Sequence, residues 1–66
     1  MTFIVNGRRE EFAERIFLNA LVEQTARKPE AVIAELNGVI VDRAKWRETQ
    51  LNEGDCLELI AFVGGG

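Results

Sequence analysis

AVIAELNGVIV, residues 31–41, contains two apolar runs on either side of the pair Asn37-Gly38. Asn-Gly between such runs is a strong hairpin signal, because both central positions of the tight turn need a positive φ. We therefore expect residues 31–36 and 39–41 to be paired antiparallel strands.

The N-terminus repeats this pattern. The apolar, β-branched run of residues 1–5 ends at Asn6-Gly7, and residues 8–12 are expected to form the returning strand. That strand is polar, and its charged residues Arg8 and Arg9 favour a solvated sheet edge, where charge discourages pairing with other chains. Contact of the two arginines with an acidic partner is the less favoured interpretation.

Residues 17–27 carry a helical period that lies between the two hairpins. The apolar stripe recurs at i, i+3, i+4, i+7 and i+8 and consists of Leu18, Leu21, Val22, Thr25 and Ala26. No capping residue precedes the helix, so the pattern does not define its start. Lys28-Pro29 is expected to end it, because proline disfavours helical backbone in the residue before it.

The rest of the chain supplies a short helix and a last strand. Asp42 is expected to cap a helical segment over residues 43–46, in which Trp46 serves as a packing anchor rather than a ligand platform. Residues 52–55 predict a turn and residues 56–63 a strand. The fold class is therefore α+β, a mixed sheet of about five strands packed on one main helix plus a short helix. Residues 1–63 form a single domain, and residues 64–66 form a flexible glycine tail.

Composition argues against several classes of function. The chain has one cysteine, Cys56, and no histidine or serine, so neither a catalytic triad nor an iron–sulfur cluster can be built, and no metal site is expected. A net charge of -3 disfavours nucleic acid, which needs a basic surface. No apolar run is long enough to span a membrane, and one unpaired cysteine suits a reducing compartment. We expect a cytoplasmic protein that is not an enzyme and has no catalytic residues.

The tail Gly64-Gly65-Gly66 is the candidate working end. Three glycines make an arm of about 10 Å that lacks Cβ atoms and can pass a narrow channel. Such an arm presents a terminal carboxylate, which must be activated, usually by ATP-dependent adenylation, before a nucleophile can attack it.

At this point the chain resembles the sulfur-carrier proteins of thiamine thiazole synthesis, the ThiS family of the ubiquitin-like superfamily. The resemblance covers the whole chain and rests on the segments Phe3-Ile4-Val5-Asn6-Gly7, Ile40-Val41-Asp42-Arg43-Ala44-Lys45-Trp46, Asn52-Glu53-Gly54-Asp55 and Phe62-Val63-Gly64-Gly65-Gly66. It implies a β-grasp fold, in which the last strand lies beside the first at the centre of the sheet. The departure is the uncapped helix start at Ile16, where the family often has a small polar residue.

The resemblance also implies a set of partners. A ThiF-like adenylating enzyme, related to ubiquitin-activating enzymes, would use ATP to adenylate Gly66, and the chain itself would bind no cofactor. A persulfide from a cysteine desulfurase would leave a Gly66 thiocarboxylate, whose sulfur a ThiG-like thiazole synthase would accept. Gly64 and Gly65 would be channel residues.

Two further features of the last strand bear on docking. Ile60 and Phe62 should share one face, with Leu57, Leu59, Ala61 and Val63 on the other, because side chains alternate along a strand. Ile60 and Phe62 are candidates for partner docking, and the alternative is a second small core under the loops. Cys56 has no obvious cationic neighbour in the sequence, so a structural role is favoured over a sulfur relay.

Three other functions stay open. The small subunit of molybdopterin synthase uses the same tail, but those proteins are typically longer. A ubiquitin-like modifier would join its last glycine to lysine. An interaction domain would leave the tail idle.

Overall fold

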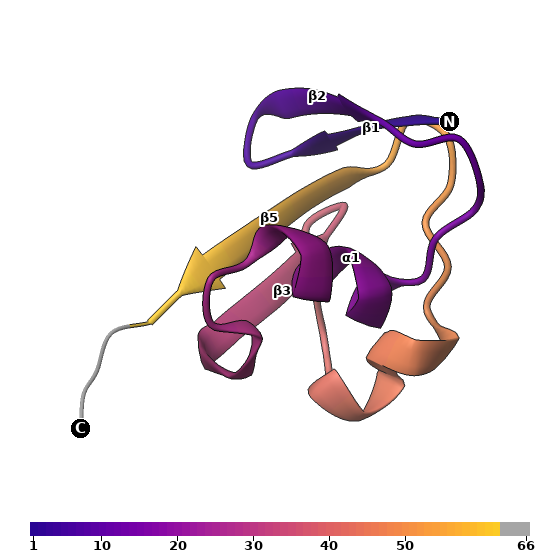
Figure 1. Cartoon of the computed structure of the whole chain (residues 1–66). Coiled ribbons are helices and arrows are strands. Elements are labelled where there is room, and N and C mark those ends of the chain that lie inside the picture. The colour runs from indigo at the N-terminus through magenta and orange to yellow at the C-terminus, as the bar shows by residue number, and fades with distance from the viewer. Residues whose placement is uncertain (63–66) are drawn as a thin grey trace.

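The computed structural model describes residues 1–62. Its elements follow the predicted order (Figure 1): β1 Thr2–Val5, β2 Arg8–Glu11, α1 Leu18–Thr25, η1 Pro29–Ala31, β3 Val32–Leu36, β4 Val39–Val41, η2 Arg43–Glu48 and β5 Cys56–Ala61. The 3-10 turn η1 was not predicted. The predicted end of the last strand, Val63, and the predicted tail 64–66 lie outside the described residues.

The five strands form one mixed sheet in the order β2-β1-β5-β3-β4. The last strand, β5, lies at the centre, parallel to β1 and antiparallel to β3. Helix α1 crosses one face of this sheet (Figure 1). The α+β class and the central place of the last strand are therefore confirmed.

Both predicted Asn-Gly turns are present. Asn6 and Gly7 have φ of 51° and 81°, and Asn37 and Gly38 have φ of 52° and 87°. Both central residues of each turn thus lie in the left-handed region that asparagine and glycine tolerate best.

The two turn asparagines also hold β5 in place. The amide N–H of Leu59 donates to Oδ1 of Asn6 at 2.7 Å, and that of Cys56 donates to Oδ1 of Asn37 at 2.9 Å. Each side chain therefore satisfies a backbone donor of the central strand, a role that turn chemistry alone does not reveal.

Helix α1 is shorter than the predicted residues 17–27. Leu18, Leu21 and Val22 are buried as expected, but Thr25 is exposed, and its hydroxyl donates to the Leu21 carbonyl at 2.6 Å. No side chain caps the start of the helix; instead the Leu18 N–H donates to the carbonyl of Thr49 at 2.7 Å. Backbone from a distant segment thus replaces the missing cap.

The second short helix differs from its prediction in two ways. It is a 3-10 helix that runs to Glu48 rather than ending at Trp46, and the Asp42 side chain makes no capping hydrogen bond. The carbonyl of Asp42 accepts from the Lys45 N–H at 2.8 Å, so the helix starts on backbone geometry.

Trp46 is the packing anchor that the sequence predicts. Its side chain is buried, and its Nε1–H donates to the carbonyl of Val41 at 3.0 Å. The guanidinium of Arg43 lies 4.3 Å from the centroid of its ring and donates to the carbonyls of Pro29, Glu30 and Val32. Tryptophan and arginine together tie η2 to the start of β3.

The core lies between α1 and the inner face of the sheet. Its buried members come from every part of the described chain: Phe3, Val5, Ile16, Leu18, Leu21, Val22, Val32, Ala34, Trp46, Leu51 and Leu57. Among residues 1–62 no polar or charged residue is buried, so burial of apolar area is the main stabilising term.

Two carboxylates face each other on the outer face of the sheet. Glu35 of β3 and Glu58 of β5 are directly opposite in the antiparallel ladder. Like charges in this position destabilise a sheet. We expect Glu58→Lys to raise the free energy of unfolding by about 0.5–1 kcal/mol and the melting temperature by about 2–8 °C, because it replaces repulsion by attraction.

Thermal unfolding followed by circular dichroism measures this effect. Glu14→Lys is the matched control, since Glu14 is exposed in the loop before α1 and its substitution changes the net charge equally. The gain of Glu58→Lys should shrink in high salt, which screens exposed charges. An equal gain in both variants would show that net charge, rather than the opposed pair, sets the difference.

Candidate functional site

The end of β5 presents an apolar surface. Ile60 is 47% exposed and Phe62 is 53% exposed, whereas Leu57 is buried and Leu59 half-buried. The predicted alternation along the strand is thus confirmed for these four residues. Neither Ile60 nor Phe62 lies under a loop of the described chain, so they form no second core there, and their role in docking stays a prediction.

Ala61 is less buried than Leu57 and Leu59, with which it was predicted to share one side of β5. It is exposed, although it alternates with Ile60 as predicted. It lines an open groove near the end of α1, where the helix no longer covers the sheet. Val63, the last residue expected on that side, lies outside the described residues.

The outer face of the sheet extends this apolar surface. Ile33 of β3 is directly opposite Ile60, and both point away from the helix. Ile4 of β1 and Ile40 of β4 are also exposed on this face, but Ile4 lies opposite Cys56 and Ile40 opposite Glu35, so the pair Ile33 and Ile60 forms the apolar extension of the β5 end. Large exposed apolar patches are one feature of interaction surfaces, and the docking role of this one stays a prediction. The sequence pattern singled out only the β5 residues, because the strands that bring the others beside them are distant in sequence.

The tail residues Gly64, Gly65 and Gly66 lie outside the described part of the chain. Their assignments as channel residues and as the modified residue therefore remain predictions. The structure describes the chain as far as Phe62. The N–H of Phe62 donates to the carbonyl of Ala31 at 3.0 Å, so the pairing of β5 with the segment before β3 reaches this last described residue.

Cys56 lies at the opposite end of β5. Its thiol is free and exposed on the outer face of the sheet, and six residues of extended strand, about 20 Å, separate it from Phe62. The exposed side chain takes no part in the core, so the structural role expected from the sequence is not confirmed.

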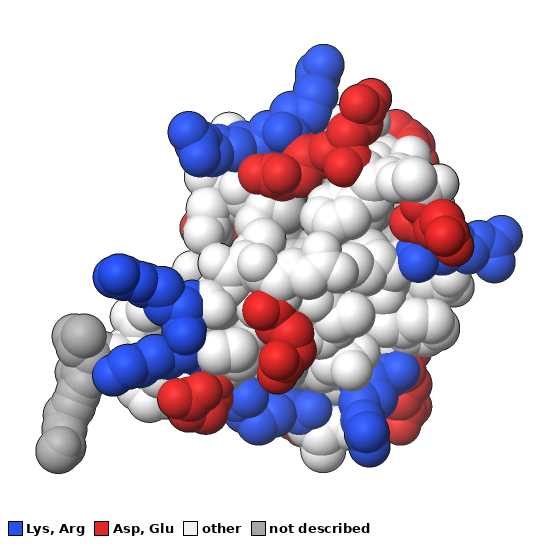
Figure 2. Space-filling view, viewed as in Figure 1, with Lys and Arg blue, Asp and Glu red and all other residues white. Residues whose placement is uncertain are grey.

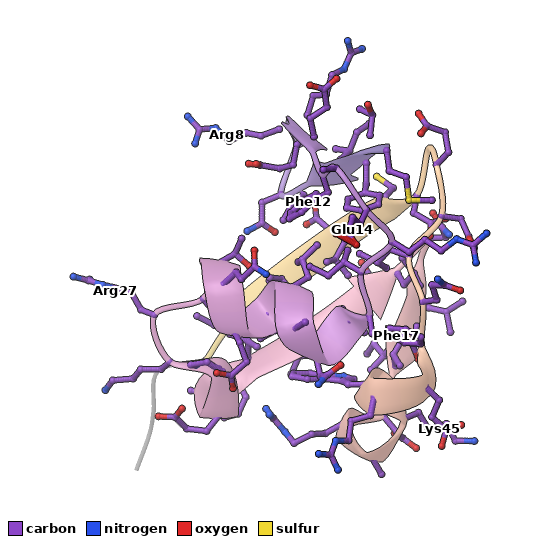
Figure 3. All side chains as sticks on the ribbon, turned by 45° about the vertical axis from the view of Figure 1, so that its right-hand side comes forward. Arg8, Phe12, Glu14, Phe17, Arg27 and Lys45 are labelled. Atoms are coloured by element: carbon purple, nitrogen blue, oxygen red, sulfur yellow. The ribbon has the colours of Figure 1, made fainter. Side chains whose placement is uncertain are left out.

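The outer strand β2 behaves as the sequence predicts. Arg8 and Arg9 are exposed, and among residues 1–62 β2 pairs with β1 alone, at one edge of the sheet. Figure 3 shows Arg8 directed away from the body of the molecule. The arginines therefore lie on a solvated edge.

Residues 1–62 lack two further features. No group of three or more histidine, cysteine, aspartate or glutamate side chains is placed to hold a metal ion. No helix of this part of the chain is long and apolar enough to cross a membrane.

A comparison with known protein families identifies the family of this chain. The model of the ThiS family matches residues 3–66, which includes both hairpins, the helix, β5 and the glycine tail. The chain belongs to the ThiS family.

Solved ThiS structures have the same fold. The crystal structure of the thiamine biosynthesis protein ThiS from Geobacter metallireducens matches this chain with a TM-score of 0.84 and 33% sequence identity. The match covers 100% of both chains. A solution structure of a thiamine biosynthesis protein from the same organism matches with a TM-score of 0.79 at 32% identity, over 100% of this chain and 88% of that one. The predicted β-grasp, ubiquitin-like fold is therefore confirmed.

Curated relatives extend the ThiS comparison. A thiazole synthase of Paramagnetospirillum magneticum is 32% identical over all 66 residues, but the chain spans only 20% of that longer protein. The uncharacterized protein ycf40 of Pyropia yezoensis is 34% identical over 62 residues, which cover 94% of this chain and 87% of that protein.

Proposed function

We propose that this ThiS-family chain is a sulfur carrier in thiamine biosynthesis and acts in the cytoplasm as a substrate of other enzymes. The observation that carries the proposal is the family match, which runs through the glycine tail to residue 66. The structural relatives named as thiamine biosynthesis proteins support the same pathway.

The proposed chemistry takes place on the carboxylate of Gly66. This carboxylate attacks the α-phosphate of ATP on a ThiF-like adenylating enzyme, which forms an acyl-adenylate and releases pyrophosphate. A persulfide supplied through a cysteine desulfurase displaces AMP, and cleavage of the resulting S–S bond by a thiol leaves the thiocarboxylate. ATP thus belongs to the partner enzyme, and the carrier holds no cofactor.

The fold contributes a rigid base for this tail. β5 is paired on both sides, by β1 and β3, and the two turn asparagines satisfy two more of its N–H groups. Because the central strand is the most constrained element of a sheet, a tail that follows it starts from a fixed point. Gly64 and Gly65 then reach the active site through a channel that side chains would block.

The proposed sulfur acceptor is a ThiG-like thiazole synthase. A protein named thiazole synthase contains a segment that matches the whole chain at 32% identity, which supports a link between this carrier domain and that enzyme.

Ile60 and Phe62 are proposed to dock both partners. We expect Ile60→Asp to lower kcat/KM for thiocarboxylate formation about tenfold or more, because an apolar side chain that becomes buried on docking carries much of the binding energy of an interface. Val39→Asp is the matched control, since Val39 is 65% exposed on the edge strand β4. Equal rates for the two variants, both folded by circular dichroism, would place the interface elsewhere.

The intact mass of the protein tests the function itself. After incubation with the ThiF-like enzyme of the same host, ATP and a persulfide donor, we expect a gain equal to the exchange of one oxygen for sulfur. Deletion of Gly66 should abolish the gain. No gain with an adenylating enzyme that is active on another carrier would contradict the proposal, and an isopeptide bond to other proteins would indicate a modifier instead.

A further inference from the structure

An open groove of about 930 Å³ lies beside the end of the described chain. Its floor is apolar and is formed by Val5, Val32 and Leu59, one residue from each of the three central strands β1, β3 and β5. The groove opens where α1 ends at Thr25, because the helix is too short to cover the sheet as far as Phe62.

Two adjacent cations, Arg27 and Lys28, form the rim of this groove. Both are exposed, and neither makes a side-chain hydrogen bond to another of the described residues. Figure 2 shows basic side chains at this edge of the molecule with an acidic side chain beside them, and Figure 3 shows Arg27 directed outward. The rim is thus cationic on a chain whose net charge is -3.

This combination fits a protein segment better than a small anion. The hydroxyl of Thr25 already donates to the Leu21 carbonyl, and no polar residue within residues 1–62 is buried, so a free anion in the groove would meet only solvated side chains of this part of the chain. An extended segment, in contrast, can bury an apolar side chain on the floor and place a carboxylate against the rim at the same time.

The position of the groove indicates which protein supplies the segment. Phe62 lines the groove and is also part of the exposed apolar end of β5. Gly66, the residue that the proposed function places on the adenylating enzyme, lies four positions beyond Phe62, a reach of about 13 Å, so an enzyme that acts on Gly66 must come close to this end of the molecule.

We propose that the groove binds an extended segment of the adenylating enzyme, with an apolar side chain on Val5, Val32 and Leu59 and a carboxylate against Arg27 and Lys28. This inference rests on the proposed function, since it assigns a docking role to the partner that activates Gly66. The groove thereby adds an electrostatic contact on the helix side of the sheet to the apolar contact on its outer face.

The test compares two double variants that change the net charge equally. Arg27→Glu with Lys28→Glu reverses the rim, and Arg8→Glu with Arg9→Glu reverses the exposed edge of β2, which takes no part in the groove. The initial rate of thiocarboxylate formation is measured against carrier concentration at low and high salt. Equilibrium binding of each carrier to the adenylating enzyme without ATP is measured in parallel.

We expect the rim variant to raise KM and to weaken binding about tenfold at low salt while kcat changes little, because opposite charges steer and hold the encounter. The difference in KM and in binding affinity between the wild type and the rim variant should fall at high salt, because salt screens the charges of the rim. The β2 variant should stay within about twofold of the wild type, since long-range charge alone has a small effect on a docked complex. Ala61→Trp, which fills the mouth of the groove without changing charge, should also weaken binding.

Equal losses in the two double variants would overturn the proposal, because they would reflect net charge. Unchanged binding in the rim variant and in Ala61→Trp would overturn it as well. Failure of the proposed function looks different: the wild type would bind the enzyme with the rim dependence described above, yet gain no sulfur. Circular dichroism confirms that each variant is folded, as expected for exposed positions.

Discussion

Replacement of Phe3 by alanine is expected to lower the free energy of unfolding by about 3–5 kcal/mol. Phe3 is fully buried at the centre of the core, and its ring lies 5.1 Å from that of Phe12. Alanine would remove the ring and leave a cavity that β1, paired on both sides, cannot collapse to fill.

The size of this effect matters because the domain is small. At about 0.05–0.15 kcal/mol per residue, a chain of 66 residues has a stability of about 3–10 kcal/mol. Phe3→Ala therefore removes a large part of the total, and the variant should be partly or wholly unfolded under conditions in which the wild type is folded. Urea unfolding followed by circular dichroism measures the difference.

Ile4→Ala is the matched control for this prediction. Ile4 is the next residue on the same strand but points to the outer face, where it is 38% exposed. Its replacement should cost much less than that of Phe3, because less apolar area is lost from the interior. Similar losses for the two variants would show that strand propensity, rather than core packing, governs the stability of β1.

Replacement of Gly65 by valine is expected to reduce thiocarboxylate formation on the order of 100-fold. The proposed channel of the adenylating enzyme admits backbone without side chains, and a branched Cβ would displace the carboxylate of Gly66 from the α-phosphate of ATP. Displacements of about 1 Å have effects of this size on reactions that depend on positioning. The initial rate of the mass gain measures the loss.

Gly65→Ala provides a graded control. Its single methyl group should produce a smaller loss than valine, while binding through Ile60 and Phe62 should persist in both variants. A wild-type rate for Gly65→Val would show that no narrow channel surrounds the tail. The proposal of a thiocarboxylate on Gly66 would survive that result, since it depends on the last residue alone.

The architecture of the chain was predictable where local chemistry determines structure. Both hairpins followed from Asn-Gly pairs, the helix from the spacing of Leu18, Leu21 and Val22, and the packing role of Trp46 from its place in a short helix. The glycine tail and the alternation along β5 likewise identified the candidate working end. The predictions that failed were local ones overridden by the surroundings. The Asp42 side chain does not cap η2, and Thr25 satisfies its hydroxyl on its own helix instead of joining the core.

By itself, therefore, the sequence determined the turns, the periods of the helix and strands, and the tail, because each depends on residues near one another in the chain. Only the tertiary structure decided what the distant segments do for one another. The link from Leu59 to Asn6 joins residues 53 positions apart, and the backbone of Thr49 replaces the cap that α1 lacks. The groove under Arg27 and Lys28 exists because α1 ends before it covers the three central strands. Such features arise from packing between elements, and no local pattern of residues encodes them.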